Sequence, residues 1–248
     1  TPAGIFFQTL AGIFVLGRDL QLNFAGAAVR DITDAYTECT SAVLVPKDSH
    51  VRFTLRNGEN GLVLVYDFDQ GAWSRWDVKR IVGAAQLVLD PVGACLHKDV
   101  YHVLASDGRV YKEDATTYFD HNSIYIPMKI ETGWLQAAQQ SGWQRIRQVA
   151  ALCKANNPHQ LTMSLYQEFD GSTPTQTYTW TEATLGAQKL QELEVMRVKQ
   201  QKCTAFKMLI EDASSAGTTT GQGYDCSGFS VELSGKRGLY KPGTQQRN

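Results

Sequence analysis

The 248-residue sequence has no excess of charge of one sign and no long apolar run. Its 24 lysines and arginines are matched by 25 acidic residues, which gives a formal net charge of -1. Proteins that bind nucleic acid through its phosphates need an excess of Lys and Arg, so the composition argues against that class. The apolar runs have only the length of strands, far below the ~20 residues of a membrane span, and we predict no span.

Both ends of the sequence are unusual. Residues 1–4 contain no initiator Met, and no charged segment followed by an apolar stretch marks a signal peptide. We therefore expect a fragment, with sequence missing upstream. At the other end, Lys236, Arg237, Lys241 and Arg247 form a mildly basic tail, which we interpret as a solvated terminus rather than a binding site.

The cysteines are few, scattered and odd in number. A zinc site needs close pairs such as C-x-x-C, because one turn must present two thiolates, and the sequence has no such pair. We expect thiols in a reducing compartment, and no metal or cofactor. The five cysteines are Cys39, Cys95, Cys153, Cys203 and Cys226.

The residue patterns of common catalytic sites are also absent. The sequence has no H-E-x-x-H, no G-x-S-x-G, no P-loop and no G-x-G-x-x-G after a strand. His102 lies in a predicted strand, where we expect a hydrogen-bonded structural role. Asp67, Asp69 and Asp77 could pair as acid and base in a glycosidase, but Asp67 and Asp69 fall in a turn, where Asp caps backbone N–H groups. We predict no enzyme, and no catalytic, cofactor-binding or metal site.

Residues 1–123 are predicted to form short strands separated by turns. Residues 51–55 alternate apolar and polar, which is typical of a strand with one buried face. Residues 62–66 are continuously apolar, as expected of an inner strand covered on both sides. Four strands occupy roughly forty residues and the order then recurs, which is typical of β-propeller blades; an irregular β-sandwich is the alternative. The predicted strands are 4–9, 12–16, 41–45, 51–55, 62–66, 72–76, 84–89, 93–96, 100–104 and 109–112.

From residue 124 the strands are longer and follow one another at a spacing typical of a two-sheet sandwich. No convincing amphipathic helix is found. We therefore predict an all-β chain: residues 1–123 form β-propeller blades of four-stranded antiparallel repeats, and residues 124–248 form an antiparallel β-sandwich with a C-terminal tail. The predicted strands of this second part are 124–134, 144–154, 161–166, 176–180, 191–198, 203–211 and 229–233.

Two tryptophans share one predicted strand. Trp73 and Trp76 lie three residues apart, so their rings should face opposite sides of the sheet. We expect one ring to pack between blades and the other to lie at a surface or an interface. An exposed ring could also stack on a sugar.

Several stretches resemble known proteins of bacteriophage tails. Two resemble propeller blades: LVLVYDFDQGAWSRWDV (residues 62–78) and VYHVLASDGRVYKED (residues 100–114). Five resemble the sandwich that follows the propeller in the tail nozzle or hub proteins of short-tailed phages: ETGWLQ, GWQRIRQV, LTMSLYQEFDG, QKCTAFKMLIED and GFSVELSGKRGLYKPGTQQR. This family is also called tail tubular protein B or packaged-DNA stabilisation protein.

The resemblance implies a structural component of the virion, made in the cytoplasm of the host bacterium. Such proteins form a homo-oligomeric ring, commonly a hexamer, below the portal and adaptor. The ring forms the distal tail channel, retains packaged DNA and opens for its ejection. The implied partners are adaptor or head–tail connector proteins, tail fibre or spike proteins, and double-stranded DNA that passes through without sequence-specific binding. Family members are usually longer, and about three blades fit in this chain.

Two other functions are left open. A carbohydrate-binding, carbohydrate-cleaving or receptor-recognition propeller would need exposed aromatic side chains and carboxylates clustered on one face. A generic propeller adaptor would bind peptides through the tops of its blades.

Overall fold

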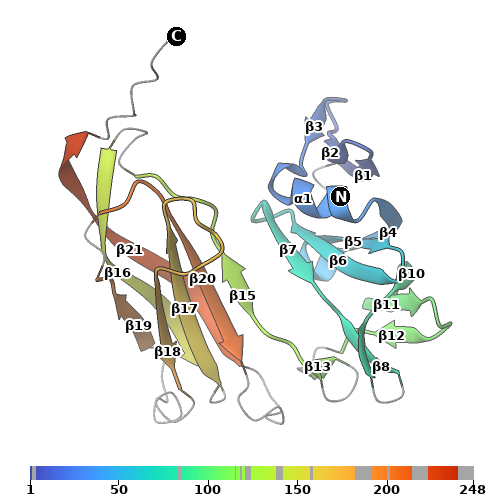
Figure 1. Ribbon diagram of the computed structural model, residues 1–248. Helices are drawn as coiled ribbons and strands as arrows, with labels where there is room; N and C mark the ends of the chain where they lie inside the picture. The colour runs from blue at the N-terminus through green and yellow to red at the C-terminus, as the bar shows by residue number, and fades with distance from the viewer. Residues whose placement is uncertain are drawn as a thin grey trace. The chain divides into compact units, whose positions relative to one another are not determined.

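The chain is almost entirely β. Among the residues that the computed structural model describes, the strands form several antiparallel sheets, with one short α-helix, α1 (Arg30–Ala35) (Figure 1). The all-β prediction is confirmed, whereas α1 was not predicted, because six residues are too few to show a helical period. The described residues are 1, 4–82, 85–114, 116–117, 119–120, 124–137, 142–156, 159–181, 192–199, 202–213 and 223–239.

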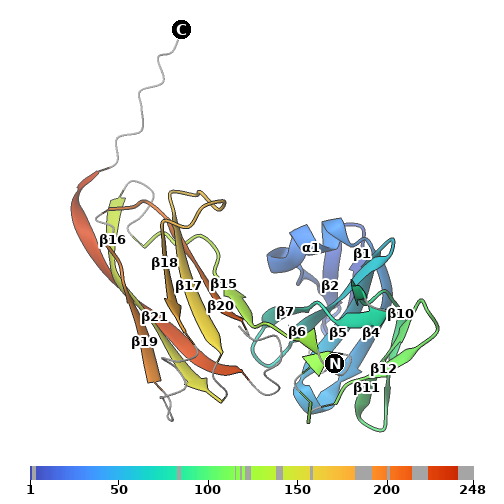
Figure 2. The same cartoon turned by 60° about the horizontal axis from the view of Figure 1, so that its bottom comes forward.

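The chain divides into two compact units, Thr1–Ile124 and Tyr125–Asn248. The first unit contains three sheets and a hairpin; its β11–β12 hairpin is clearly visible in green in Figure 2. The sheets are β1 (Ile5–Thr9), β2 (Gly12–Leu16) and β3 (Leu22–Phe24); β4 (Glu38–Val45), β5 (His50–Asn57), β6 (Asn60–Asp67) and β7 (Ala72–Trp76); and β10 (Pro91–His97), β11 (Val100–Ala105) and β12 (Val110–Lys112). The remaining elements are the hairpin β8 (Lys79–Val82)–β9 (Ala85–Val88), the 3-10 turns η1 (Ala27–Val29) and η2 (Pro46–Asp48), and the two-residue strands β13 (Phe119–Asp120) and β14 (Ile124–Tyr125).

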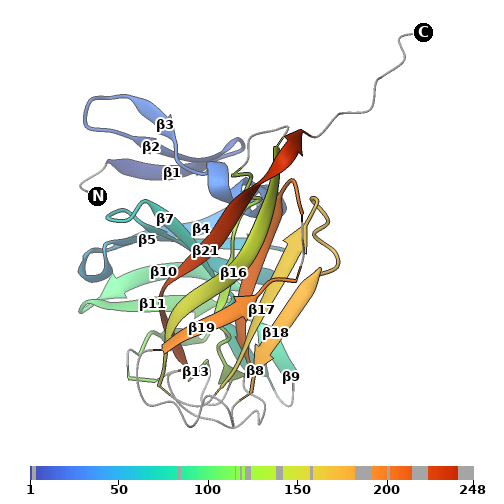
Figure 3. The ribbon, with the colours of Figure 1, turned by 90° about the vertical axis from the view of Figure 1, so that its left-hand side faces the viewer.

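The three sheets of the first unit are stacked in chain order (Figure 3). The middle sheet is covered on both faces, because successive residues of β6 point to opposite sides. Leu62 and Leu64 join a core with Ile13 of β2, while Val63 and Val65 join a core with residues of β11. The prediction of an inner strand covered on both sides is confirmed for β6.

The neighbouring strand β5 differs from its prediction. Its alternating pattern predicted one buried face, but Arg52 is 1% exposed and Thr54 is fully buried, along with the apolar residues of the strand. The polar face is covered because the sheet β10–β12 packs over it, which a pattern within a single strand cannot show.

The second predicted set of four strands is wrong in its pairing. β9 pairs with β8 in a separate hairpin, and β10–β12 form a sheet of three strands. Leu89 and Asp90 stand between β9 and β10, and β10 begins at Pro91, which has no N–H with which to continue a ladder from β9. Pro91 instead packs against Gly61 of β6, where a Cβ atom would lie 2.0 Å from the proline ring.

The second unit consists of two sheets, which form two layers in Figure 2. Its predicted long strand 124–134 is interrupted, because Pro127 cannot donate a ladder hydrogen bond. One sheet has the order β15 (Lys129–Glu131), β20 (Phe206–Ala213), β17 (Gln160–Gln167) and β18 (Gln176–Trp180). The other has the order β19 (Glu192–Arg197), β16 (Gly142–Ala155) and β21 (Tyr224–Leu239).

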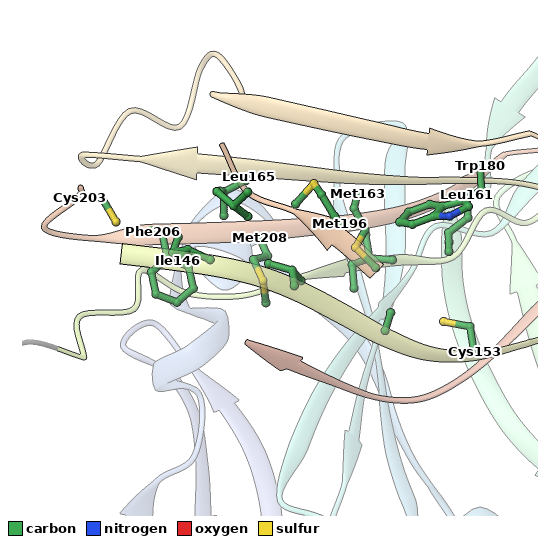
Figure 4. Packing of buried hydrophobic residues seen from close by; sticks show 14 residues of the cluster. Ile146, Cys153, Leu161, Met163, Leu165, Trp180, Met196, Cys203, Phe206 and Met208 are labelled. Carbon is green, nitrogen blue, oxygen red and sulfur yellow. The ribbon is translucent and has the colours of Figure 1, made fainter. Parts of the chain in front are cut away.

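One hydrophobic core lies between these two sheets (Figure 4). β17 alternates as predicted, with Leu161, Met163 and Leu165 at most 1% exposed. They pack with Ile146 of β16 and Phe206 of β20. Burial of such side chains contributes about 1.5–3 kcal/mol each to stability.

Candidate interaction surface and buried polar clusters

The two faces of the sheet β1–β3 have different surroundings. One face contributes Ile13 to the core shared with the middle sheet. The antiparallel register places only apolar residues in two rows on the opposite face, which we call the outer face. These rows are Ile5–Leu16–Leu22 and Phe7–Phe14–Phe24.

The aromatic rings of the outer face contact one another, and the face is partly exposed to solvent: Phe7, Phe14 and Leu16 are half-buried, and Ile5, Leu22 and Phe24 are exposed. The ring centroids of Phe7 and Phe14 are 6.4 Å apart, and those of Phe14 and Phe24 are 5.1 Å apart. Ile5 is 66% exposed and Leu22 is 57% exposed. Contiguous exposed apolar patches of this kind are a mark of interaction sites.

Two further leucines, in the turns at the two ends of β2, are strongly exposed. Leu10, in the β1–β2 turn, is 100% exposed, and Leu20, before β3, is 79% exposed. Leu20 also has a φ of 62°, in the left-handed region that branched residues rarely adopt. A leucine in such a conformation, with its side chain in water, is unfavourable for an isolated monomer.

Trp73 and Trp76 face opposite sides of the middle sheet, as predicted. Trp73 packs on Tyr66, with ring centroids 4.7 Å apart, and its Nε1 donates to the carbonyl of Ala25 at 3.0 Å. Trp76 lies on the other side, beside Arg52. Both rings are half-buried, and each packs against the core on its own side of the sheet, so neither ring is fully exposed.

Arg52 is the centre of a polar cluster between the middle sheet and β10–β12. Its Nη1 lies 2.6 Å from Oε2 of Glu113, and its Nη2 lies 2.7 Å from Oδ2 of Asp48. The guanidinium carbon lies 4.5 Å from the Trp76 ring centroid and 4.8 Å from that of Tyr101. We call these five residues the Arg52 cluster; it ties two sheets together with charge-assisted hydrogen bonds and cation–π contacts.

Burial strongly affects one member of this cluster. The loss of solvent around Tyr101 raises the pKa of its phenol well above the ordinary value. Its hydroxyl is buried and has no hydrogen-bond partner among the described residues. Arg52 is buried, whereas the side chains of its two partners reach the solvent: Asp48 is 36% exposed and Glu113 is 39% exposed. The buried part of the cluster joins the two sheets.

The residues considered as catalytic candidates in the sequence form local hydrogen bonds and an ion pair. Asp67 Oδ1 accepts the backbone N–H groups of Asp69 at 2.9 Å and Gln70 at 3.0 Å, which confirms the predicted turn. Asp77 forms an ion pair with Arg75 at 2.7 Å. His102 Nδ1 lies 2.9 Å from the carbonyl oxygen of Val100; because a carbonyl can only accept, Nδ1 carries the proton.

A second polar cluster, in the second unit, was not predicted. Tyr125, His159 and Asp212 meet at one end of the sheet β15–β20–β17–β18, and we call them the Asp212 cluster. The Tyr125 hydroxyl donates to Asp212 and lies 3.0 Å from His159 Nδ1. Asp212 also accepts the backbone N–H of Met128. His159 is fully buried and Asp212 is 3% exposed, so the cluster fixes the segment that precedes β15 to the core.

The Asp212 cluster predicts a dependence of stability on alkaline pH. Desolvation, and the hydrogen bond to Asp212, raise the pKa of Tyr125 above its ordinary value of about 10. The folded state therefore keeps a proton that the unfolded state loses, so this stability is complete below about pH 10 and falls as the pH rises further. We expect urea unfolding between pH 8 and 11 to show a steeper loss for the wild type than for Tyr125→Phe. Parallel curves for the two proteins would contradict this expectation.

Metal sites and membrane-spanning helices are two further features that bear on function. Among the described residues, no group of three or more His, Cys, Asp and Glu side chains is placed to bind a metal ion. No helix in the described part of the chain is long and apolar enough to cross a membrane.

No protein-family model and no curated protein matches this sequence. One matching solved structure is a glycoside hydrolase family 43 arabinoxylan arabinofuranohydrolase from Bacillus subtilis, in complex with cellotetraose. The identity is 9%, the TM-score is 0.25, and the match covers 77% of this chain and 53% of the other. The chain thus spans about half the length of the protein it matches.

This match corrects one prediction. The expectation that the chain is not an enzyme is contradicted, because the matched protein is a glycoside hydrolase, and we withdraw it. A TM-score of 0.25 with 9% identity transfers neither a fold nor an activity to this chain.

Proposed function

We propose that this chain is a structural component of a bacteriophage tail, in which copies assemble into a ring below the portal and adaptor. The observation that carries the proposal is the outer face of the sheet β1–β3, an apolar surface in contact with solvent. The sequence resemblance to tail nozzle and hub proteins identifies the kind of assembly. In this proposal the first unit is part of a β-propeller and the second is a β-sandwich.

The stacking within the first unit supports a role of the outer face in assembly. Each of the two cores of this unit forms where one sheet packs against the next. The outer face is apolar like the core around Ile13, and the six residues of its two rows include no charged residue that would oppose burial. We infer that this face packs against a different surface of the next copy, since a heterologous contact closes into a ring when the rotation between copies allows it.

The remaining parts of the proposal are what the sequence resemblance to tail nozzle and hub proteins implies. The ring would contact adaptor and fibre or spike proteins, retain packaged double-stranded DNA, and let it pass without sequence-specific binding. A wall of low net charge suits this passage, because phosphate contacts from many Lys and Arg residues would retard sliding. The chain would be made in the host cytoplasm and reside in the virion.

The assembly is tested by the mass of the protein in solution. We expect light scattering and negative-stain images to show a ring of about six copies, formed by the protein alone or on purified adaptor. Leu22→Lys places a charge on the exposed outer face and should reduce the assembly to monomers without lowering the melting temperature. Val110→Lys is the matched control, since Val110 is 64% exposed on β12 and lies outside the outer face. A wild-type monomer that ignores adaptor, or equal assembly by Leu22→Lys, would overturn the proposal.

A second candidate function is carbohydrate binding at the Arg52 cluster. The half-buried ring of Trp76 lies beside Arg52, whose partners Asp48 and Glu113 are partly exposed. An aromatic ring next to carboxylates is the combination that sugar recognition uses. Calorimetry with cellotetraose and arabinoxylan fragments tests it: binding that Glu113→Gln weakens, by a protein that stays monomeric, would favour this function over the ring.

A further inference from the structure

Two of the five cysteines face each other across a pair of strands. The register of β16 and β21 places Cys153 opposite Cys226, next to a β-bulge at which the register shifts between Leu152 and Cys153. The other cysteines have different partners: Cys39 is opposite Leu55, Cys95 is opposite His102, and Cys203 is opposite Gln144. The pairing was invisible in the sequence, because the two cysteines are far apart along the chain.

The geometry of this pair suits a covalent bond. Directly opposite residues of antiparallel strands point to the same face, with Cα atoms about 4.5–5.5 Å apart. A disulfide needs a Cα separation of about 4.4–6.8 Å. Both side chains belong to one environment: Cys153 is 3% exposed in the core between the two sheets, and Cys226 packs against that core (Figure 4, where Cys153 is labelled).

We propose that Cys153 and Cys226 are a redox pair that closes into a cross-strand disulfide in the presence of a low-molecular-weight disulfide. Cys226, the more exposed of the two, reacts first. Its thiolate attacks one sulfur of the oxidant, whose S–S bond breaks and releases one thiolate. The Cys153 thiolate then attacks Sγ of Cys226 and displaces the second. Each cysteine loses one proton, and the two electrons reduce the oxidant to two thiols.

The bond would join the two longest strands of the second unit, β16 and β21, which are paired along most of their length. It would close a long loop of chain, and cross-links that close long loops restrict the unfolded state most strongly. The inference does not depend on the proposed function. A protein that is made in a reducing cytoplasm and then released to oxidising surroundings would experience the change in redox conditions that favours formation of this disulfide.

Oxidised glutathione is the probe for this pair. After treatment of the full chain and removal of the reagent, we expect peptide mapping by mass spectrometry to find Cys153 joined to Cys226, without bound glutathione. The melting temperature should rise by about 5 °C or more, and dithiothreitol should reverse the rise.

Two variants make the test specific. Cys226→Ser should remove both the cross-link and the rise in melting temperature. Cys203→Ser should leave both unchanged; Cys203 is buried, which raises its pKa to about 11 and makes it a poor nucleophile at neutral pH. A glutathione adduct that persists on Cys226, or a pair that stays fully alkylatable after oxidation, would overturn the inference.

Discussion

Replacing Arg52 with alanine is expected to lower the free energy of unfolding of the first unit by about 3–5 kcal/mol. The side chain of Arg52 is 1% exposed and forms ion pairs with Asp48 and Glu113. Its loss would leave two carboxylates without their cation, and a cavity between the rings of Trp76 and Tyr101. Urea denaturation followed by tryptophan fluorescence measures the change.

Two comparison variants separate packing from charge in this experiment. Arg52→Met fills much of the same space, and the partly exposed carboxylates can be hydrated, so its loss should be smaller than that of alanine. Arg75→Ala removes an ion pair with Asp77 in which both side chains are exposed by more than 40%. This control should change stability by less than about 1 kcal/mol. An Arg52→Ala variant as stable as Arg75→Ala would show that the buried cluster contributes little.

Replacing Asp212 with alanine should destabilise the second unit by about 3 kcal/mol. The carboxylate accepts hydrogen bonds from the Tyr125 hydroxyl and the Met128 backbone N–H, and its Oδ2 lies 3.5 Å from His159 Nδ1. Removal leaves these buried donors without an acceptor, and an unmet buried hydrogen bond costs about 1–3 kcal/mol. The free energy of unfolding, measured in urea at pH 7, reports the loss.

The matched variants test whether the hydrogen bonds are the cause. Asp212→Asn keeps one acceptor oxygen and the size of the side chain, so it should lose less stability than alanine. Glu232→Ala removes a carboxylate from β21 that is 48% exposed and 3.6 Å from Arg147. We expect a change of less than about 1 kcal/mol there. Equal losses for Asp212→Ala and Glu232→Ala would contradict the role assigned to the Asp212 cluster.

Much of the strand structure was predictable, because it depends on short stretches of chain. The continuous apolar run of β6 correctly indicated a strand covered on both sides, and the alternation of β17 correctly indicated its buried face. The turn at Asp67 was also predictable, since an aspartate caps the N–H groups that directly follow it. The interrupted strand at Pro127 could have been found from the proline itself.

The sites were less predictable than the strands. Arg52 stands at a polar position of an alternating strand, which suggested that its side chain is exposed to solvent. In the structure the sheet β10–β12 covers that face of β5, and Arg52 is buried. The Asp212 cluster joins residues from three separate segments, none of which has a distinctive local pattern. The sequence predicted β1 and β2 of the sheet that carries the outer face, but it missed the three-residue strand β3. It also could not show that one face of this sheet is left partly exposed.

The sequence by itself determined that this chain forms antiparallel strands, where most of them lie, and which residues turn the chain between them. These outcomes depend on the alternation of side chains and on turn residues, which act over a few positions. Only the tertiary structure decided which sheets stack, that Arg52 is buried, that Cys153 faces Cys226, and that the outer face of β1–β3 remains uncovered. The physical reason is that burial is a property of two surfaces, and each strand encodes only one of them.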